Sequence, residues 1–76
     1  MVRAFVLIDA ASGTPAPVCQ TVCETEEVVD AHVITGDFDV MVEVTGDDPQ
    51  TILTTVTESI RPLEGVGTTR TYVCLD

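Results

Sequence analysis

The chain has 76 residues, 45% of them hydrophobic, and 13 acidic residues against three basic ones give it a net charge of −10 at pH 7. Such a length fits one domain, residues 1–76, and a domain this small buries only about 60% of its unfolded surface, so the apolar surplus favours oligomerisation. The acidic balance excludes direct binding to nucleic-acid phosphates, and no apolar run approaches the roughly 20 residues of a membrane span.

The first residues run directly into an apolar stretch, so we expect no signal peptide. The three cysteines, an odd number, then indicate reduced thiols in the cytoplasm. The chain contains no lysine, and its acidic residues are spread along its length. Because high ionic strength screens repulsion within an acidic surface, a halophilic source is a hypothesis that this composition supports.

Residues 2–8 form a nearly continuous apolar run, which predicts a strand covered on both faces. Residues 9–17 contain Gly and Pro and predict a loop. A short helix is expected to begin at Thr14–Pro15 or at Pro17 and to end near Glu24. Its apolar stripe would consist of Val18, Cys19, Val22 and Cys23.

Two β-branched segments follow, and they predict strands over Val28–Thr35 and Asp39–Thr45. In the second of these segments the alternate residues would share one face; they are Val40, Val42 and Val44. Gly36-Asp37 between the segments predicts a two-residue hairpin turn, since glycine readily adopts the positive φ that such turns need.

A second helix is predicted after Asp47. Asp48 is a suitable N-cap, Pro49 suits the first helical position, and Pro62 would end the helix. Its expected apolar stripe consists of Ile52, Leu53, Val56 and Ile60. Residues 63–67 predict a turn, and Thr68–Leu75 predicts a final strand.

The element order is therefore strand, helix, strand, strand, helix, strand. This order predicts an α+β, ferredoxin-like βαββαβ fold, in which a four-stranded antiparallel sheet carries both helices on one face. The first strand is apolar on both sides, so the other face of the sheet would expose a large apolar patch. A homodimer that packs through this face would cover the patch.

Few residues offer metal or nucleophilic chemistry. Cys19 and Cys23 have the i, i+4 spacing of two side chains that can share a metal, but nothing in the sequence places His32 or Cys74 nearby. We favour the interpretation that both helix cysteines are small apolar residues of a buried stripe. His32 is expected at the surface or the edge of the core, and no acidic residue lies at a spacing that would indicate a catalytic pair. We predict no metal, no cofactor and no catalytic residue.

Asp37 and Asp39 flank Phe38 and would point to one face of an extended hairpin. Paired carboxylates can bind an ammonium group or a metal ion, or transfer protons, but they are also common in solvated turns. The residues alone leave these alternatives open, with the turn favoured. The hydroxyls of Thr68, Thr69 and Thr71 either line a polar pocket or belong to an ordinary strand.

Two motifs resemble the effector-binding domain of the Lrp/AsnC transcription regulators, also called the RAM domain. The first is a Thr-Gly-Asp-aromatic-Asp hairpin, here Thr35, Gly36, Asp37, Phe38 and Asp39. The second is a segment rich in glycine and threonine that follows the second helix, here Ile60, Leu63, Gly65, Val66, Thr69 and Thr71. The resemblance spans almost the whole chain.

The resemblance implies a ferredoxin-like homodimer, often assembled further into rings of dimers, that binds an amino-acid effector between neighbouring dimers. Backbone amides of Gly36 and Asp37 would receive a carboxylate, and Asp37 or Asp39 an ammonium. The implied ligand-binding residues are Gly36, Asp37, Phe38, Asp39, Thr68, Thr69 and Thr71. Full-length members carry an N-terminal helix-turn-helix, which we do not expect here, so the chain resembles a stand-alone domain that would sense an effector or assemble with full-length regulators.

Two other functions remain as alternatives. A small ferredoxin-like α+β barrel enzyme would need polar side chains inside the barrel, for which Arg70 and Tyr72 are the local candidates. An ACT-like regulatory module would share the fold and the effector class, but it would be expected to carry more glycine than Gly13 after the first strand.

Overall fold

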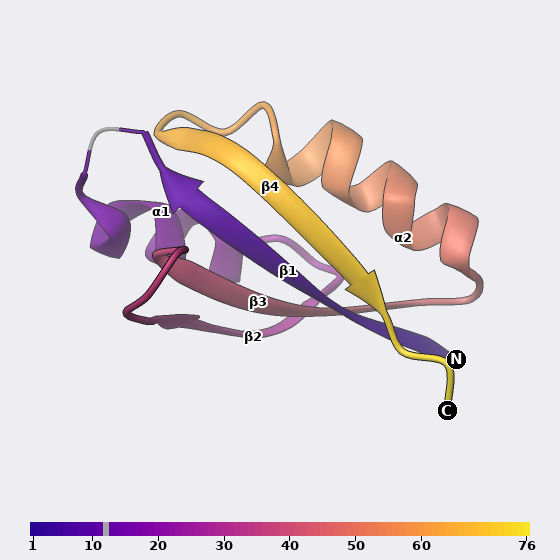
Figure 1. Ribbon diagram of the computed structural model, residues 1–76. Coiled ribbons are helices and arrows are strands. Elements are labelled where there is room, and N and C mark those ends of the chain that lie inside the picture. Colours follow the sequence, from indigo (N-terminus) through magenta and orange to yellow (C-terminus); the bar gives the residue numbers. More distant parts are fainter. Residues whose placement is uncertain (12) are drawn as a thin grey trace.

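The chain forms one four-stranded antiparallel sheet in the order β2-β3-β1-β4, with two helices against it (Figure 1). A computed structural model describes residues 1–11 and 13–76. The elements are β1 (Val2–Ala10), α1 (Pro15–Cys23), β2 (Val28–Val33), β3 (Val40–Gly46), α2 (Pro49–Thr55), the π-helical turn η1 (Val56–Ile60) and β4 (Val66–Val73). The predicted ferredoxin-like βαββαβ fold is confirmed.

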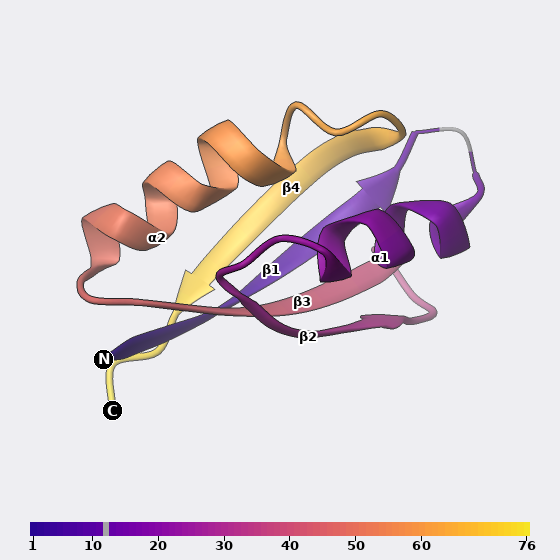
Figure 2. The ribbon, with the colours of Figure 1, turned by 180° about the vertical axis from the view of Figure 1, so that it is seen from behind.

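The core lies between the helices and one face of the sheet. Alternate residues of β1 and β3 point to this face, as the period of a strand requires. Both helices cover the same face, which is visible when the molecule is seen from behind (Figure 2). The buried core residues are Ala4, Val6, Ile8, Ala10, Val18, Val22, Val40, Val42, Val44, Ile52, Val56 and Ile60.

The predicted two-residue hairpin turn is wrong. Strand β2 ends at Val33 and β3 begins at Val40, so residues 34–39 form a longer connection. The backbone N–H of Ile34 donates to the carbonyl oxygen of Asp39 (2.8 Å), while the N–H of Asp39 donates to that of Ile8 (2.9 Å). Asp39 is therefore bonded both across the connection and to β1. Gly36 does adopt the expected positive φ, of 127°.

Strand β1 continues to Ala10, although a loop was predicted from residue 9, because Ala10 pairs with Val66 of β4. Strand β4 accordingly begins at Val66 instead of Thr68. Of the predicted 9–17 loop, Ser12 lies outside the described residues.

Helix α2 begins as predicted. The carboxylate of Asp48 accepts hydrogen bonds from the backbone N–H of Thr51 (2.8 Å) and from its hydroxyl (2.9 Å), and Pro49 occupies the first turn. In η1 the N–H of Arg61 donates to the carbonyl oxygen of Val56, an i→i+5 bond. Leu53, predicted in the apolar stripe, is instead 46% exposed.

In residues 1–11 and 13–76 no helix lies on the second face of the sheet, and we call this face the open face. Antiparallel register places Leu7 between Met41 and Arg70, and Phe5 between Glu43 and Tyr72. Strand β2 extends both rows with His32 and Asp30. The prediction that β1 is apolar on both sides is confirmed, since Phe5 and Leu7 are half-buried on this face.

Candidate functional site

Three segments meet at one end of the sheet, away from the chain termini (Figure 1). They are the end of β1 with Ala11, the 34–39 connection, and the start of β4 with residues 64–65; we call this region the loop end. The backbone N–H of Ala11 donates to the carbonyl oxygen of Gly65 (2.8 Å). The N–H of Asp39 donates to Ile8. The two sequence motifs, far apart in the chain, are thus held to the same strand.

Asp39 ties the connection to β1 through its side chain as well. Its Oδ2 accepts a hydrogen bond of 2.9 Å from the backbone N–H of Ala10, and the residue is half-buried. A carboxylate that accepts a backbone N–H satisfies a donor that would otherwise lack a partner in this partly buried region. Asp37, by contrast, is exposed to solvent. The two carboxylates therefore have different surroundings, and Asp37 is the one accessible to a ligand.

Phe38 lies between these acids and contacts β4. The guanidinium carbon of Arg70 lies 5.9 Å from the centre of the Phe38 ring, within the range of a cation–π interaction. Arg70 points to the open face beside Leu7, so this contact brings the 34–39 connection to the edge of that face. The sequence reasoning considered Arg70 only as an enzyme residue and missed this pairing, because nothing in the spacing of residues 38 and 70 indicates it.

The three predicted threonines lie on two faces of β4. Thr69 pairs with Ile8 and Thr71 with Val6, so both half-buried side chains face the helices. Thr68 is exposed and lies where the register shifts between Ile8 and Ala10. Gly67 lies in the same irregularity, where a Cβ would come within 3.0 Å of the carbonyl oxygen of Asp9. The structure thus places Thr68, and not Thr69 or Thr71, on the side of Arg70.

Two grooves are found among the described residues, one beside α2 and one beside α1, and the second is lined in part by Glu64 and Gly65 of the loop end. One, of about 410 Å³, follows α2 and is lined by Glu27, Asp48, Gln50, Thr51, Thr54, Thr55, Glu58 and Ser59. The other, of about 490 Å³, lies beside α1 and is lined by Thr14, Pro17, Val18, Thr21, Glu64 and Gly65. Neither groove is lined by the predicted ligand-binding residues. On the single chain these residues therefore do not enclose a pocket, and we call them the rim of the loop end.

The cysteines differ from one another. Cys19 is half-buried against the core, whereas Cys23 is exposed, so the prediction that both lie on a buried stripe is wrong for Cys23. The reason is that Cys23 is the last residue of α1. Burial, together with the neighbouring Cys23 thiol, raises the pKa of Cys19. Within residues 1–11 and 13–76, no three His, Cys, Asp or Glu side chains are grouped as metal ligands would be.

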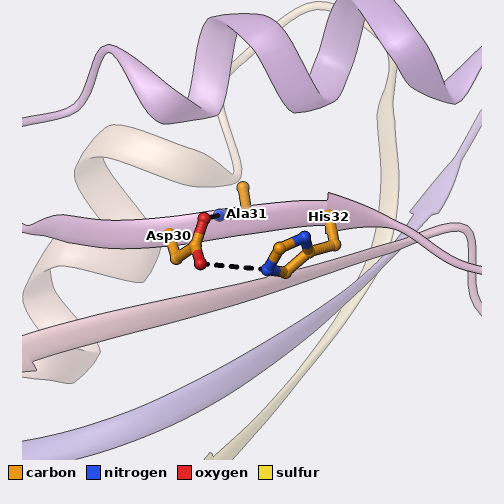
Figure 3. A network of polar contacts seen from close by, with 3 residues as sticks. All are labelled: Asp30, Ala31 and His32. Carbon is orange, nitrogen blue, oxygen red and sulfur yellow. Dashed lines mark hydrogen bonds and ion pairs between the residues drawn. The ribbon is translucent and has the colours of Figure 1, made fainter.

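His32 is a surface residue, as expected, but it has an acidic partner that the sequence reasoning missed. Its Nε2 lies 3.0 Å from Oδ2 of Asp30, whose Oδ1 accepts a hydrogen bond from the backbone N–H of Ala31 (Figure 3). Residues i and i+2 of a strand share a face, so this spacing does predict the pair. Both side chains are more than half exposed, 59% for His32 and 57% for Asp30.

Charges also border the apolar part of the open face. The guanidinium of Arg3 lies 3.7 Å from the carboxylate of Glu43 and over the ring of Phe5, 5.8 Å from its centre. A hydrogen bond with Cys74, followed by the charges of Cys74 and Glu43, raises the pKa of Arg3. Phe5, Leu7, Met41 and Tyr72 thus form an apolar centre with polar residues around it, the composition of a protein interface.

Comparison with known proteins identifies what this arrangement is similar to. The sequence profile of the Lrp/AsnC ligand binding domain matches residues 3–76. A curated relative from Pyrococcus abyssi, an uncharacterised HTH-type transcriptional regulator, is 32% identical over 76 residues, which is 96% of this chain and 51% of the relative. The chain therefore spans about half the length of that relative. These similar proteins are transcriptional regulators and not enzymes.

Solved structures agree with the fold. The crystal structure of FFRP-DM1 is 31% identical, with a TM-score of 0.89 over 99% of this chain and 100% of the other. A transcriptional regulator from Neisseria meningitidis in complex with L-Met has a TM-score of 0.84 over 99% of this chain and 50% of its own, at 18% identity. The second likeness is one of fold. In the part of the chain that the structure describes, no helix is long and apolar enough to cross a membrane.

Proposed function

We propose that this chain, which belongs to the Lrp/AsnC ligand-binding domain family, is an effector-binding and oligomerisation module that takes part in transcription regulation. In this proposal it binds a small amino acid or a related metabolite in the cytoplasm. It transmits the binding by assembling with itself or with full-length regulators of the same family.

The observation that carries this proposal is the junction of the two sequence motifs at the loop end. Asp39 fixes the connection to β1, and Phe38 reaches Arg70 of β4, while Asp37 and Gly36 remain exposed. An exposed backbone around a glycine and an accessible carboxylate are suitable partners for the two charged groups of an amino acid. Thr68 adds a hydroxyl on the side of Arg70. The ligand would contact Thr69 and Thr71 from the outer edge of β4.

The open face supports the proposed homodimer. Its centre is apolar, and Tyr72 remains 54% exposed on the single chain. Burying the remaining apolar surface of this side chain against a second copy would favour association. Because the loop end borders this face, a second copy, or a neighbouring dimer in a ring, would complete the rim into an enclosed pocket. The complex of the Neisseria meningitidis regulator with L-Met is consistent with an amino-acid effector.

A thermal-shift screen of the free L-amino acids, in high salt, tests effector binding, and light scattering on the same samples tests assembly. We expect saturable stabilisation by a small subset of amino acids and a mass of at least a dimer. If every amino acid leaves the melting temperature unchanged and the protein is a monomer at micromolar concentration, the proposal is wrong.

A further inference from the structure

Helix α1 carries two of the three cysteines of the chain on one side of the helix. Cys19 and Cys23 have the i, i+4 spacing, and such residues are neighbours on a helix surface, with Cβ atoms about 5–6 Å apart. Cys19 packs against the core, whereas Cys23, the last residue of the helix, is exposed. The pair therefore has one thiol that packing holds in place and one that solvent reaches.

The two thiols also act on each other. Burial, followed by the charge of Cys23 and a hydrogen bond with Cys23, raises the pKa of Cys19, and the charge of Asp30 adds to this rise. Both thiols are free, since neither belongs to a disulfide. The two sulfur atoms are therefore close enough to bind one ligand without a rearrangement of α1.

The number of ligands limits which metal ion this pair can hold. A structural zinc ion takes four protein ligands, and in residues 1–11 and 13–76 no group of three or more His, Cys, Asp or Glu side chains is placed to hold an ion. Two sulfurs are sufficient for a soft cation that takes two ligands in a line, and thiolates select Cu(I). Two metal–sulfur bonds of about 2.3 Å in a line span about 4.6 Å, which the Cβ spacing of about 5–6 Å allows.

The charge around the end of α1 favours a cation over an anion. Glu24 and Glu26, both exposed, follow the helix directly, and the carboxylate of Asp30 is near enough to affect Cys19. A surface of one sign raises the local concentration of ions of the opposite sign. The carbonyl groups at the C-terminal end of the helix add the negative end of its dipole beside Cys23.

We propose that Cys19 and Cys23 form a two-coordinate thiolate site for a soft monovalent cation, for which Cu(I) is the probe. Each sulfur releases its proton to solvent as it binds the ion, and no electron is transferred. The site lies on α1, which carries none of the rim residues. It is therefore a binding function beyond effector binding, and its test does not depend on the proposed function.

Titration of the reduced protein with Cu(I) under anaerobic conditions tests this site, with a coloured Cu(I) chelator as competitor and in a buffer without chloride, which itself binds Cu(I). We expect one Cu(I) per chain. Cys19→Ser and Cys23→Ser should each weaken binding by at least about a hundredfold, because losing a ligand costs more than losing one of its outer partners. Cys74→Ser is the matched control: it removes a thiol beside Arg3, near the chain termini, and should keep the wild-type affinity.

X-ray absorption of the loaded protein measures the coordination directly, and two sulfur neighbours are expected. Circular dichroism checks the fold of each variant, and the exposed position of Cys23 makes Cys23→Ser the decisive one if Cys19→Ser unfolds. The inference is overturned if the wild-type protein yields all Cu(I) to the chelator, if one ion binds per two chains, or if Cys74→Ser weakens binding as much as Cys23→Ser does. Retention of one ion by the wild type and Cys74→Ser, with its loss in Cys23→Ser, supports it.

Discussion

The carboxylate of Asp39 accepts a hydrogen bond of 2.9 Å from the backbone N–H of Ala10, 29 residues away in the chain. This bond, and not a tight hairpin turn, determines the path of the 34–39 connection. It also explains why a motif with two aspartates contributes one accessible carboxylate to the rim.

Asp39→Ala should therefore destabilise the fold. Removing the acceptor leaves the N–H of the buried residue Ala10 without its partner, which typically costs about 1–3 kcal/mol. Chemical denaturation at fixed salt measures this loss. Asp37→Ala is the control, since it removes an equal charge from an exposed position and should change the free energy of unfolding by no more than about 0.5 kcal/mol. Equal effects of the two substitutions would contradict a structural role for Asp39.

The N-cap residue Asp48 leads to a second prediction, which concerns how the stability of the fold depends on pH. Hydrogen bonds from the backbone N–H and then the hydroxyl of Thr51 lower the pKa of Asp48 below its ordinary value. A carboxyl whose pKa is lower in the folded state stabilises the protein above its unfolded pKa, about 3.9, and this contribution disappears as the pH falls through the folded pKa. The N-cap of α2 should thus weaken below about pH 4.

Asp48→Asn keeps an N-cap acceptor but does not titrate, so it isolates this effect. On going from pH 6 to pH 3, the melting temperature of the wild type should fall by more than that of Asp48→Asn. Asp48→Ala should melt a few degrees lower than the wild type at pH 7. A constant difference between wild type and Asp48→Asn across this range would show that the cap does not depend on ionisation.

The net charge of −10 predicts that salt stabilises the fold. Repulsion among exposed acids opposes the compact state, and the Debye length falls from about 30 Å at 0.01 M salt to about 3 Å at 1 M. The melting temperature should rise with NaCl concentration over this range. A variant with Glu24, Glu26 and Glu58, all exposed, replaced by Gln should show a smaller rise. Equal slopes for both proteins would mean that screening of these charges is not the cause.

Sequence periodicity was sufficient for the fold because the apolar residues of β3 repeat with the period of a strand and those of both helices with the period of a helix. The alternation of Val40, Val42 and Val44, and the Asp48-Pro49 start of α2, correspond directly to buried positions and to a cap in the structure. The details of the loop end were not predictable in this way. The bond from Ala10 to Asp39 and the contact between Phe38 and Arg70 join residues about 30 positions apart. Such contacts depend on the order of the strands in the sheet, and local spacing does not contain that information.

Tyr72 provides the test of the open face. It is 54% exposed there, and Leu53, 46% exposed on α2, is a similarly exposed apolar residue on the opposite layer. In Tyr72→Asp a charge would be buried at the proposed interface, where an unpaired ion is strongly disfavoured, while Leu53→Asp leaves that face unchanged.

We therefore expect Tyr72→Asp to shift the protein to a monomer in light scattering at micromolar concentration, and Leu53→Asp to keep the wild-type mass. Circular dichroism should show both variants folded, since neither side chain belongs to the core. If Leu53→Asp dissociates the assembly and Tyr72→Asp does not, the subunits associate through the helical layer, and the rim at the loop end is then completed by some other contact than the open face.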